Sequence, residues 1–166
     1  MESAGLPNAG LADQLAAMRF VSDNIGQLGG DGDAMTVWGE SAGASSILHH
    51  LVSTETLPFK RVLLQSPAFQ WLWDRKGGLN ATYTNFSTAV GCPNGDISCV
   101  RSKDAGTLQQ ANQNLWQDAA CNGIFPVGPA VDGKIIKTLP PVALASGECV
   151  TVSNRRGRRK KYIWQG

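Results

Sequence analysis

Apolar residues near the start of the chain recur at the spacing of one helix face. Steps of three and four residues separate Leu11, Leu15, Met18, Val21, Ile25 and Leu28. This spacing predicts an amphipathic helix over residues 11–28. The glycine-rich segment 29–33 then predicts the end of that helix, because glycine adopts the positive φ of a helix C-cap without a steric penalty.

Two short apolar segments, residues 34–38 and 61–65, predict strands. The first is apolar almost throughout and the second at its centre, as expected of strands covered on both faces of a parallel sheet. A helix is predicted between them over 44–52, and the order helix, strand, helix, strand is typical of a parallel sheet with crossover helices. The predicted fold class is therefore α/β. Further helices are predicted over 83–90, 107–116 and 139–145.

The composition is that of a soluble globular protein. Of the 166 residues, 42% are hydrophobic and 17% are charged, and this length suits one domain of about 100–200 residues. No apolar run approaches the roughly 18 residues of a membrane-spanning helix. The N-terminus also lacks the basic start and apolar stretch of a signal peptide. We therefore expect no membrane span, and no signal peptide is visible.

Charge is distributed unevenly along the chain. The net charge of +2 suggests no polyanionic partner, but six basic residues cluster near the C-terminus, at Arg155, Arg156, Arg158, Arg159, Lys160 and Lys161. We interpret residues 1–150 as one domain and 151–166 as a basic tail, disordered or added by an unspliced intron or a shifted reading frame. The other interpretation is a nuclear-localisation or polyanion-binding patch, which predicts salt-dependent retention on DNA. We favour the first interpretation and expect no nucleic-acid partner.

The cysteines and two glycosylation sequons bear on the cellular compartment. Cys92 and Cys99 flank a turn-rich segment, and their spacing leaves open whether they form a disulfide or remain free thiols. The segments Asn80-Ala81-Thr82 and Asn85-Phe86-Ser87 fit the Asn-x-Ser/Thr pattern, so Asn80 and Asn85 are candidate N-glycosylation sites. Two sequons beside a candidate disulfide favour a secreted protein. No cysteine pair has metal-ligand spacing, so no metal site is predicted.

The segment Gly39-Glu40-Ser41-Ala42-Gly43 is the candidate catalytic motif. It fits the pattern G-x-S-x-G, in which a serine on a sharp strand-to-helix turn holds its hydroxyl above the sheet edge. We expect both flanking glycines to be needed, because a Cβ at either position would collide with the neighbouring strand and helix. The N–H of Ala42 would donate to the oxyanion formed when Ser41 attacks a carbonyl, aided by the positive end of the following helix. The alternative is a purely structural Gly/Ser turn.

Longer stretches around this motif resemble the type-B carboxylesterase/lipase family, which includes cholinesterases and fungal lipases. The resemblance is carried by residues 8–14 (Asn-Ala-Gly-Leu-Ala-Asp-Gln), 29–31 (Gly-Gly-Asp) and 36–44 (Thr-Val-Trp-Gly-Glu-Ser-Ala-Gly-Ala). It continues through residues 65–66 (Gln-Ser), 91–101 and 125–133.

This resemblance implies a partial α/β-hydrolase fold with parallel central strands, crossover helices and a nucleophile elbow. It implies Ser41 as nucleophile, Ala42 as oxyanion donor, Glu40 as a buried supporting carboxylate, and a disulfide between Cys92 and Cys99. It also implies hydrolysis of small-molecule or lipid carboxylic esters through an acyl-enzyme, without a metal or an organic cofactor. Many members are secreted, which implies an extracellular parent protein.

The catalytic set in this chain is incomplete. The triad of these hydrolases runs in the order Ser, Asp or Glu, His, but the two histidines of the chain, His49 and His50, follow Ser41 within nine residues on the same predicted helix. At 1.5 Å of rise per residue, both lie below the nucleophile and cannot meet its hydroxyl. The glycine-rich oxyanion loop and the triad acid are also missing, since Asp132 and Glu148 do not occupy the acid's place. We therefore expect this chain alone to be inactive.

An incomplete hydrolase domain should also be unstable. A sheet without its other strands and later helices would expose strand edges and apolar faces, so the chain should be unstable and aggregate. The exposed residues would include Trp71, Trp73 and Trp116.

The alternative function is that of a non-catalytic binding or adhesion protein with the same fold. Such relatives usually replace the nucleophilic serine, and the intact Ser41 argues against this alternative.

Overall fold

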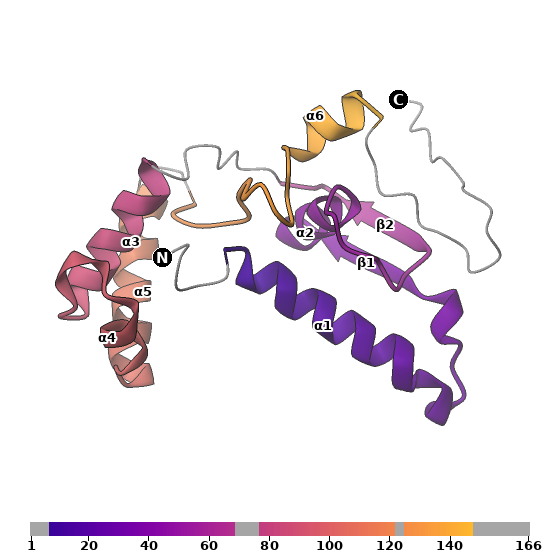
Figure 1. Cartoon of the computed structure of the whole chain (residues 1–166), viewed down its shortest axis with the longest axis horizontal. Coiled ribbons are helices and arrows are strands. Elements are labelled where there is room, and N and C mark those ends of the chain that lie inside the picture. The colour runs from indigo at the N-terminus through magenta and orange to yellow at the C-terminus, as the bar shows by residue number, and fades with distance from the viewer. Residues whose placement is uncertain (1–6, 69–76, 122–124, 148–166) are drawn as a thin grey trace. The chain divides into compact units, whose positions relative to one another are not determined.

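The computed structural model describes residues 7–68, 77–121 and 125–147, and these form two compact units. The first unit is made of Met1–Asn8 and Gln70–Ala130, and the second of Ala9–Phe69 and Val131–Gly166. Figure 1 shows the elements of each unit. The predicted basic tail 151–166, together with Trp71 and Trp73, lies outside the described residues.

The second unit contains the predicted order of helix, strand, helix and strand. Its elements are α1 (Ala9–Asn24), a 3₁₀ turn (Ile25–Leu28), a second 3₁₀ turn (Gly32–Ala34), β1 (Thr36–Glu40), α2 (Ala42–Leu51), β2 (Arg61–Gln65) and α6 (Pro140–Ala145). The predicted types of these elements are confirmed, with ends that shift by a few residues. Gly29 follows the first 3₁₀ turn with a φ of 80°, the left-handed cap that glycine favours.

Only the first half of the apolar face of α1 is buried. Leu11 and Leu15 are inside the core, whereas Val21 is 42% exposed and Leu28, in the following 3₁₀ turn, is 85% exposed. The hydrophobic periodicity therefore predicts the helix correctly, but it extends beyond the surface that the described residues provide for packing.

The two strands form a parallel pair. Thr36 pairs with Arg61 and the register continues to Glu40 opposite Gln65. The prediction that both strands are buried is wrong, because Trp38 is 68% exposed and Leu63 is 52% exposed. The reason is that the sheet has two strands among the described residues, which leaves apolar side chains uncovered. The expected exposure of apolar sheet surface is thereby confirmed.

Helix α2 contributes a large part of the core of this unit. Ala44, Ile47 and Leu48 are buried on it. The segment after Val131 joins this core, since Ile136 is 1% exposed and forms an antiparallel bridge with Ser53. A segment that is distant in the sequence is thus joined to the residues that follow α2.

The first unit is helical and contains a disulfide. Its elements are α3 (Gly78–Ala89), a 3₁₀ turn (Pro93–Gly95), α4 (Ile97–Arg101) and α5 (Ala105–Cys121). Cys92 and Cys99 are joined with an S–S distance of 2.02 Å. Cys92 is fully buried in a cluster with Val90, Val100 and Ala111, so the disulfide fixes α4 against the end of α3. No helix of the described residues has the length and apolar character to cross a membrane.

Candidate active site

Ser41 is a single-residue turn between β1 and α2. The strand ends at Glu40, the helix begins at Ala42, and Ser41 between them has φ 50° and ψ −117°. A non-glycine residue with this backbone is strained, at a cost of about 1–3 kcal/mol, and such strain is concentrated at functional sites. The G-x-S-x-G pattern predicted this turn from the sequence, and the turn is present.

Backbone hydrogen bonds hold the turn on both sides. The N–H of Ser41 donates to the carbonyl of Gln65 at 3.0 Å, and the carbonyl of Ser41 accepts from the N–H of Ser45 at 3.0 Å. The first bond continues the β1–β2 ladder by one residue, and the second begins the hydrogen bonding of α2. Ser41 is thus fixed by the sheet and by the helix at once.

Gly39 is required at this turn for steric reasons. A Cβ built on Gly39 would lie 2.5 Å from the carbonyl carbon of Gly43 and 2.7 Å from the nitrogen of Ala44. The expectation of a collision at Gly39 is therefore confirmed. The same expectation at Gly43 is wrong, because a Cβ there meets no atom of the described residues within 4 Å. The close approach is between the backbone of α2 and position 39, so the constraint acts on one glycine.

The loop after β2 also reaches the turn, which sequence reasoning missed. The N–H of Ala68 lies 3.4 Å from the carbonyl of Ser41, and the hydroxyl of Ser45 donates to the carbonyl of Ala68. Ser66 at the start of this loop has a φ of 44°. The pair Ser66-Pro67 directly after a predicted strand was the available signal, because a chain that leaves a parallel strand through proline must turn at the sheet edge.

The N–H group of Ala42 is available for an acceptor outside the helix. The first four N–H groups of an α-helix have no intrahelical acceptor, and Ala42 is the first residue of α2. The helix dipole adds a partial positive charge at this end. The turn therefore places an N–H group next in sequence to the hydroxyl of Ser41, which is itself half-buried.

Glu40 is exposed in this structure, so the expectation of a buried supporting carboxylate is wrong for the described chain. The physical reason is the small sheet. Glu40 ends β1, opposite Gln65 of β2, and nothing in the described residues covers its side chain enough to bury it.

Both histidines of α2 are buried, and each ring forms a hydrogen bond, one within α2 and one to α1. His49 Nδ1 donates to the carbonyl of Ser45 at 2.8 Å, and His50 Nε2 donates to the Gln14 side-chain oxygen at 3.1 Å. Burial lowers the pKa of His49, and burial, together with the neighbouring His49, lowers the pKa of His50 to about 4. Both rings therefore favour the neutral form at pH 7.

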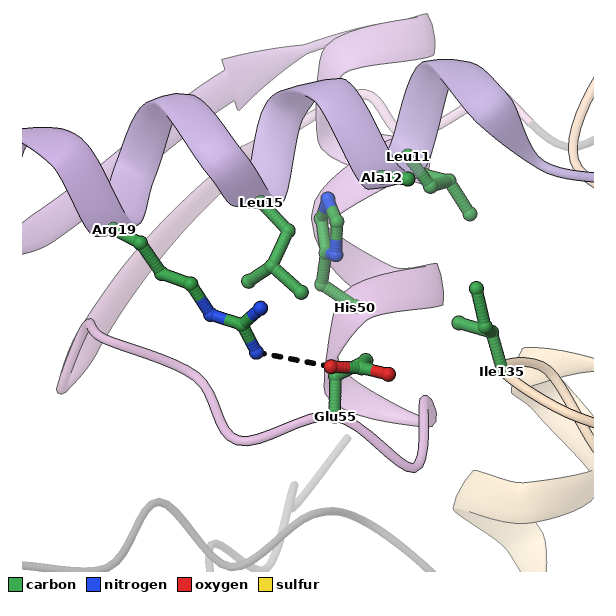
Figure 2. Close-up of a pocket in the computed structure, with 7 residues that line it drawn as sticks. All are labelled: Leu11, Ala12, Leu15, Arg19, His50, Glu55 and Ile135. Atoms are coloured by element: carbon green, nitrogen blue, oxygen red, sulfur yellow. Dashed lines mark hydrogen bonds and ion pairs between the residues drawn. The ribbon is translucent and has the colours of Figure 1, made fainter. Parts of the chain in front are cut away.

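A small pocket lies beside His50, at the end of α2 opposite Ser41. Figure 2 shows its lining residues, which come from α1, from α2 and the loop that follows it, and from the segment after Val131. Its volume is about 150 Å³, and Arg19 and Glu55 form an ion pair of 2.9 Å in its wall. Because this pocket does not adjoin Ser41, it gives no information about an ester substrate.

Asp132 has a structural role in the second unit. It is buried, and its Oδ1 accepts from the N–H groups of Lys134 and Ile136 at 2.8 and 2.9 Å. These bonds shape the turn before the bridge to Ser53. The other acidic residue considered, Glu148, lies outside the described residues. Among the residues that the structure describes, no group of three or more His, Cys, Asp or Glu side chains is placed to hold a metal ion.

Comparison with known proteins gives consistent matches along almost the whole chain. Residues 2–154 match the sequence profile of the "Carboxylesterase family". A secreted lipase of Arthroderma benhamiae is 36% identical over 150 residues, which cover 89% of this chain and 28% of the lipase. An acetylcholinesterase of Electrophorus electricus is 35% identical over 149 residues, which cover 84% of this chain and 23% of that enzyme.

Solved structures match the fold as well. The carboxylesterase EST55 of Geobacillus stearothermophilus superposes with a TM-score of 0.70 at 34% identity, over 84% of this chain and 29% of that one. Aspergillus niger EstA superposes with a TM-score of 0.75 at 26% identity, over 91% of this chain and 31% of that one. The chain thus spans less than a third of the length of each of these relatives.

Proposed function

The chain belongs to the carboxylesterase family, and from this premise we propose that Ser41 is the nucleophile of a serine carboxylesterase or lipase. The observation that carries the proposal is the strained backbone of Ser41, with φ 50° and ψ −117°, between β1 and α2. A structural turn would be made more cheaply by glycine. A serine held in this conformation is explained by the need to raise a hydroxyl above the sheet edge.

The proposed reaction is acyl transfer through a covalent intermediate. Ser41 Oγ attacks the carbonyl carbon of the ester, and its proton passes to a general base. The tetrahedral oxyanion accepts a hydrogen bond from the N–H of Ala42, and the alcohol leaves to give an acyl-serine, which water hydrolyses. Gly39 contributes by letting α2 approach β1 closely enough to form the turn.

Neither histidine of this 166-residue chain is proposed as the general base of the reaction. His49 and His50 are the two histidines of the sequence, and their rings hydrogen-bond to Ser45 and Gln14. We propose that the base, the triad acid and the glycine-rich oxyanion loop belong to the part of the relatives' length that this chain does not span. The 166-residue chain alone is then inactive.

A first experiment separates the two parts of the proposal. The 166-residue chain and its Ser41→Ala variant are compared for hydrolysis of p-nitrophenyl acetate and for labelling by a fluorophosphonate probe. We expect equal background hydrolysis and no labelling, because nothing deprotonates Ser41. Turnover by the chain that Ser41→Ala removes would contradict the inactivity of the chain while supporting the role of Ser41.

A second experiment supplies the missing groups. Residues 8–68 replace the equivalent segment of the Geobacillus stearothermophilus carboxylesterase, to which this chain is 34% identical. We expect the chimera to hydrolyse p-nitrophenyl acetate and Ser41→Ala to lower the rate by about 10⁴-fold or more. Ser46→Ala, which removes a half-buried hydroxyl from the same helix α2, is the matched control. A folded chimera whose rate is the same with Ser41→Ala would overturn the proposal.

The substrate class and the compartment are proposed from the relatives. Their printed descriptions include a secreted lipase and an acetylcholinesterase, so we propose a small-molecule or lipid carboxylic ester as substrate and an extracellular parent protein. The disulfide between Cys92 and Cys99 supports the compartment, because disulfides persist in oxidising surroundings. A non-catalytic binding protein of the same fold is not favoured, since such a protein has no use for a strained serine at this turn.

A further inference from the structure

Both glycosylation sequons lie inside one helix. Asn80-Ala81-Thr82 and Asn85-Phe86-Ser87 are part of α3, which runs from Gly78 to Ala89, and Figure 1 shows this helix in the first unit. The side chains of Asn80 and Asn85 are exposed. A glycan attached to either asparagine would therefore extend into solvent without disturbing the packing of the helix.

The helix itself opposes the transfer of the glycan. The transferring enzyme must reach the asparagine amide and the hydroxyl two residues later together. In an α-helix, residues i and i+2 do not face each other, because each residue turns by about 100°. Each sequon is therefore a substrate only while its part of α3 is unfolded.

The two sequons differ in how firmly folding closes them. Asn80 and Thr82 lie in the first turns of α3, where helices fray. Ser87 lies near the other end of α3, is fully buried, and its hydroxyl donates to the carbonyl of Thr84 at 2.9 Å. The N–H of Cys92 donates to the carbonyl of Ser87 at 2.7 Å, so the second sequon is tied directly to the disulfide-bonded core.

We propose that Asn80 is an N-glycosylation site and that modification of Asn85 competes with folding of α3 and closure of the Cys92–Cys99 disulfide. In the modification step the amide nitrogen of asparagine attacks the anomeric carbon of an oligosaccharide carried on a lipid diphosphate. A C–N bond forms, the C–O bond to the diphosphate breaks, and the amide nitrogen loses one proton. The lipid diphosphate is the leaving group. Asn80 carries its glycan in most molecules and Asn85 in a minority.

The experiment measures glycan occupancy at each site. The whole 166-residue chain is directed into the endoplasmic reticulum of a eukaryotic cell by a cleavable leader, and peptide mass spectrometry with and without peptide N-glycosidase gives the occupied fraction. We expect Asn80→Gln to remove most of the glycosidase-sensitive mobility shift and Asn85→Gln to remove little of it. Asn112→Gln, an exposed asparagine of α5 outside any sequon, is the matched control and leaves the shift unchanged.

The competition is tested by slowing the folding of the unit. Reducing agent in the culture, or the Cys92→Ser/Cys99→Ser double variant, should raise the occupied fraction of Asn85 and leave Asn80 unchanged. An unoccupied Asn80 overturns the assignment of the site. Equal occupancy of both asparagines, or an Asn85 fraction that does not rise when the disulfide is absent, overturns the competition. The inference rests on the proposed extracellular compartment, but none of these outcomes depends on ester hydrolysis, so its failure and the failure of the proposed esterase function are distinguishable.

Discussion

Gly39 and Gly43 approach each other so closely that a methyl group on Gly39 would lie 2.5 Å from the carbonyl carbon of Gly43. The relationship is not reciprocal, since a Cβ on Gly43 meets no described atom within 4 Å. The two glycines of one motif therefore have different reasons to be glycine. Gly39 is needed for the approach of α2 to β1, whereas Gly43 is not needed for the packing of the described chain.

This difference predicts opposite effects of one substitution. Gly39→Ala should lower the free energy of unfolding by about 1–3 kcal/mol or more, because backbone atoms of α2 must move. Gly43→Ala should leave it unchanged or raise it by about 0.5–1 kcal/mol, because alanine is favoured over glycine within a helix. Urea unfolding followed by circular dichroism measures both. Equal losses in the two variants would contradict the steric argument.

Strain at Ser41 predicts a stabilising substitution at the proposed nucleophile. Ser41→Gly should raise the free energy of unfolding by about 1 kcal/mol, because glycine adopts a φ of 50° without the steric cost of a Cβ. Ser46→Gly, in the interior of α2, should instead lower it by about 0.5 kcal/mol. The same unfolding measurement applies to both variants. A loss of stability in Ser41→Gly would show that the turn is not strained.

The sequence predicted the elements of this fold well because their patterns are local. The apolar period of α1 and the glycines around Ser41 specify a helix and a turn within a few residues. The short α4 was missed, since a helix of five residues shows no periodicity. The burial of β1 and the covering of Glu40 were wrong, because burial depends on what packs against a strand, and the described sheet has two strands. The pair Ser66-Pro67 signalled a turn after β2, but the hydrogen bonds that join Ala68 to Ser41 and Ser45 depend on how the loop packs, which a local pattern does not give.

The buried histidines predict a loss of stability in mild acid. Burial lowers the pKa of His49, and burial and His49 lower the pKa of His50 to about 4. The unfolded chain protonates both rings below about pH 6.5, so it binds more protons than the folded chain and stability falls as the pH decreases from there. His50 alone should account for about 1–2 kcal/mol between pH 7 and pH 5.

Urea unfolding at pH 7, 6 and 5 measures this dependence where carboxylates remain ionised. His50→Gln should flatten the dependence and His49→Gln should flatten it partly, whatever either substitution does to the stability at pH 7. A wild-type chain that is equally stable at pH 7 and pH 5 would contradict the burial of these rings.

The side chain of Asn8 predicts a long-range contribution to the first unit. Its amide donates to the carbonyl of Ala130 at 2.9 Å, and its oxygen accepts from the N–H of Ala130 at 2.8 Å, across 122 residues of sequence. Asn8→Ala should lower the stability of this unit by about 1–3 kcal/mol, since both backbone groups lose their partner. Hydrogen exchange at the amide of Ala130 should accelerate correspondingly.

A glycine variant separates these hydrogen bonds from backbone strain. Asn8 has a φ of 62°, which glycine tolerates and alanine does not, so Asn8→Gly should lose about 1 kcal/mol less than Asn8→Ala. Exchange at Ala130 should be fast in both variants. Unchanged protection of the Ala130 amide in Asn8→Ala would show that the side chain does not hold this segment.

The uncovered sheet predicts self-association through its apolar surface. Leu63 in β2 is 52% exposed and Trp38 in β1 is 68% exposed, and exposed strands with apolar side chains pair with other copies. Leu63→Lys should reduce aggregation, because a charge on the strand opposes both pairing and burial. Ala16→Lys adds the same charge on the exposed part of α1 and serves as the matched control. Dynamic light scattering against concentration should show smaller particles for Leu63→Lys than for Ala16→Lys, and equal sizes in the two variants would mean that association does not proceed through the sheet.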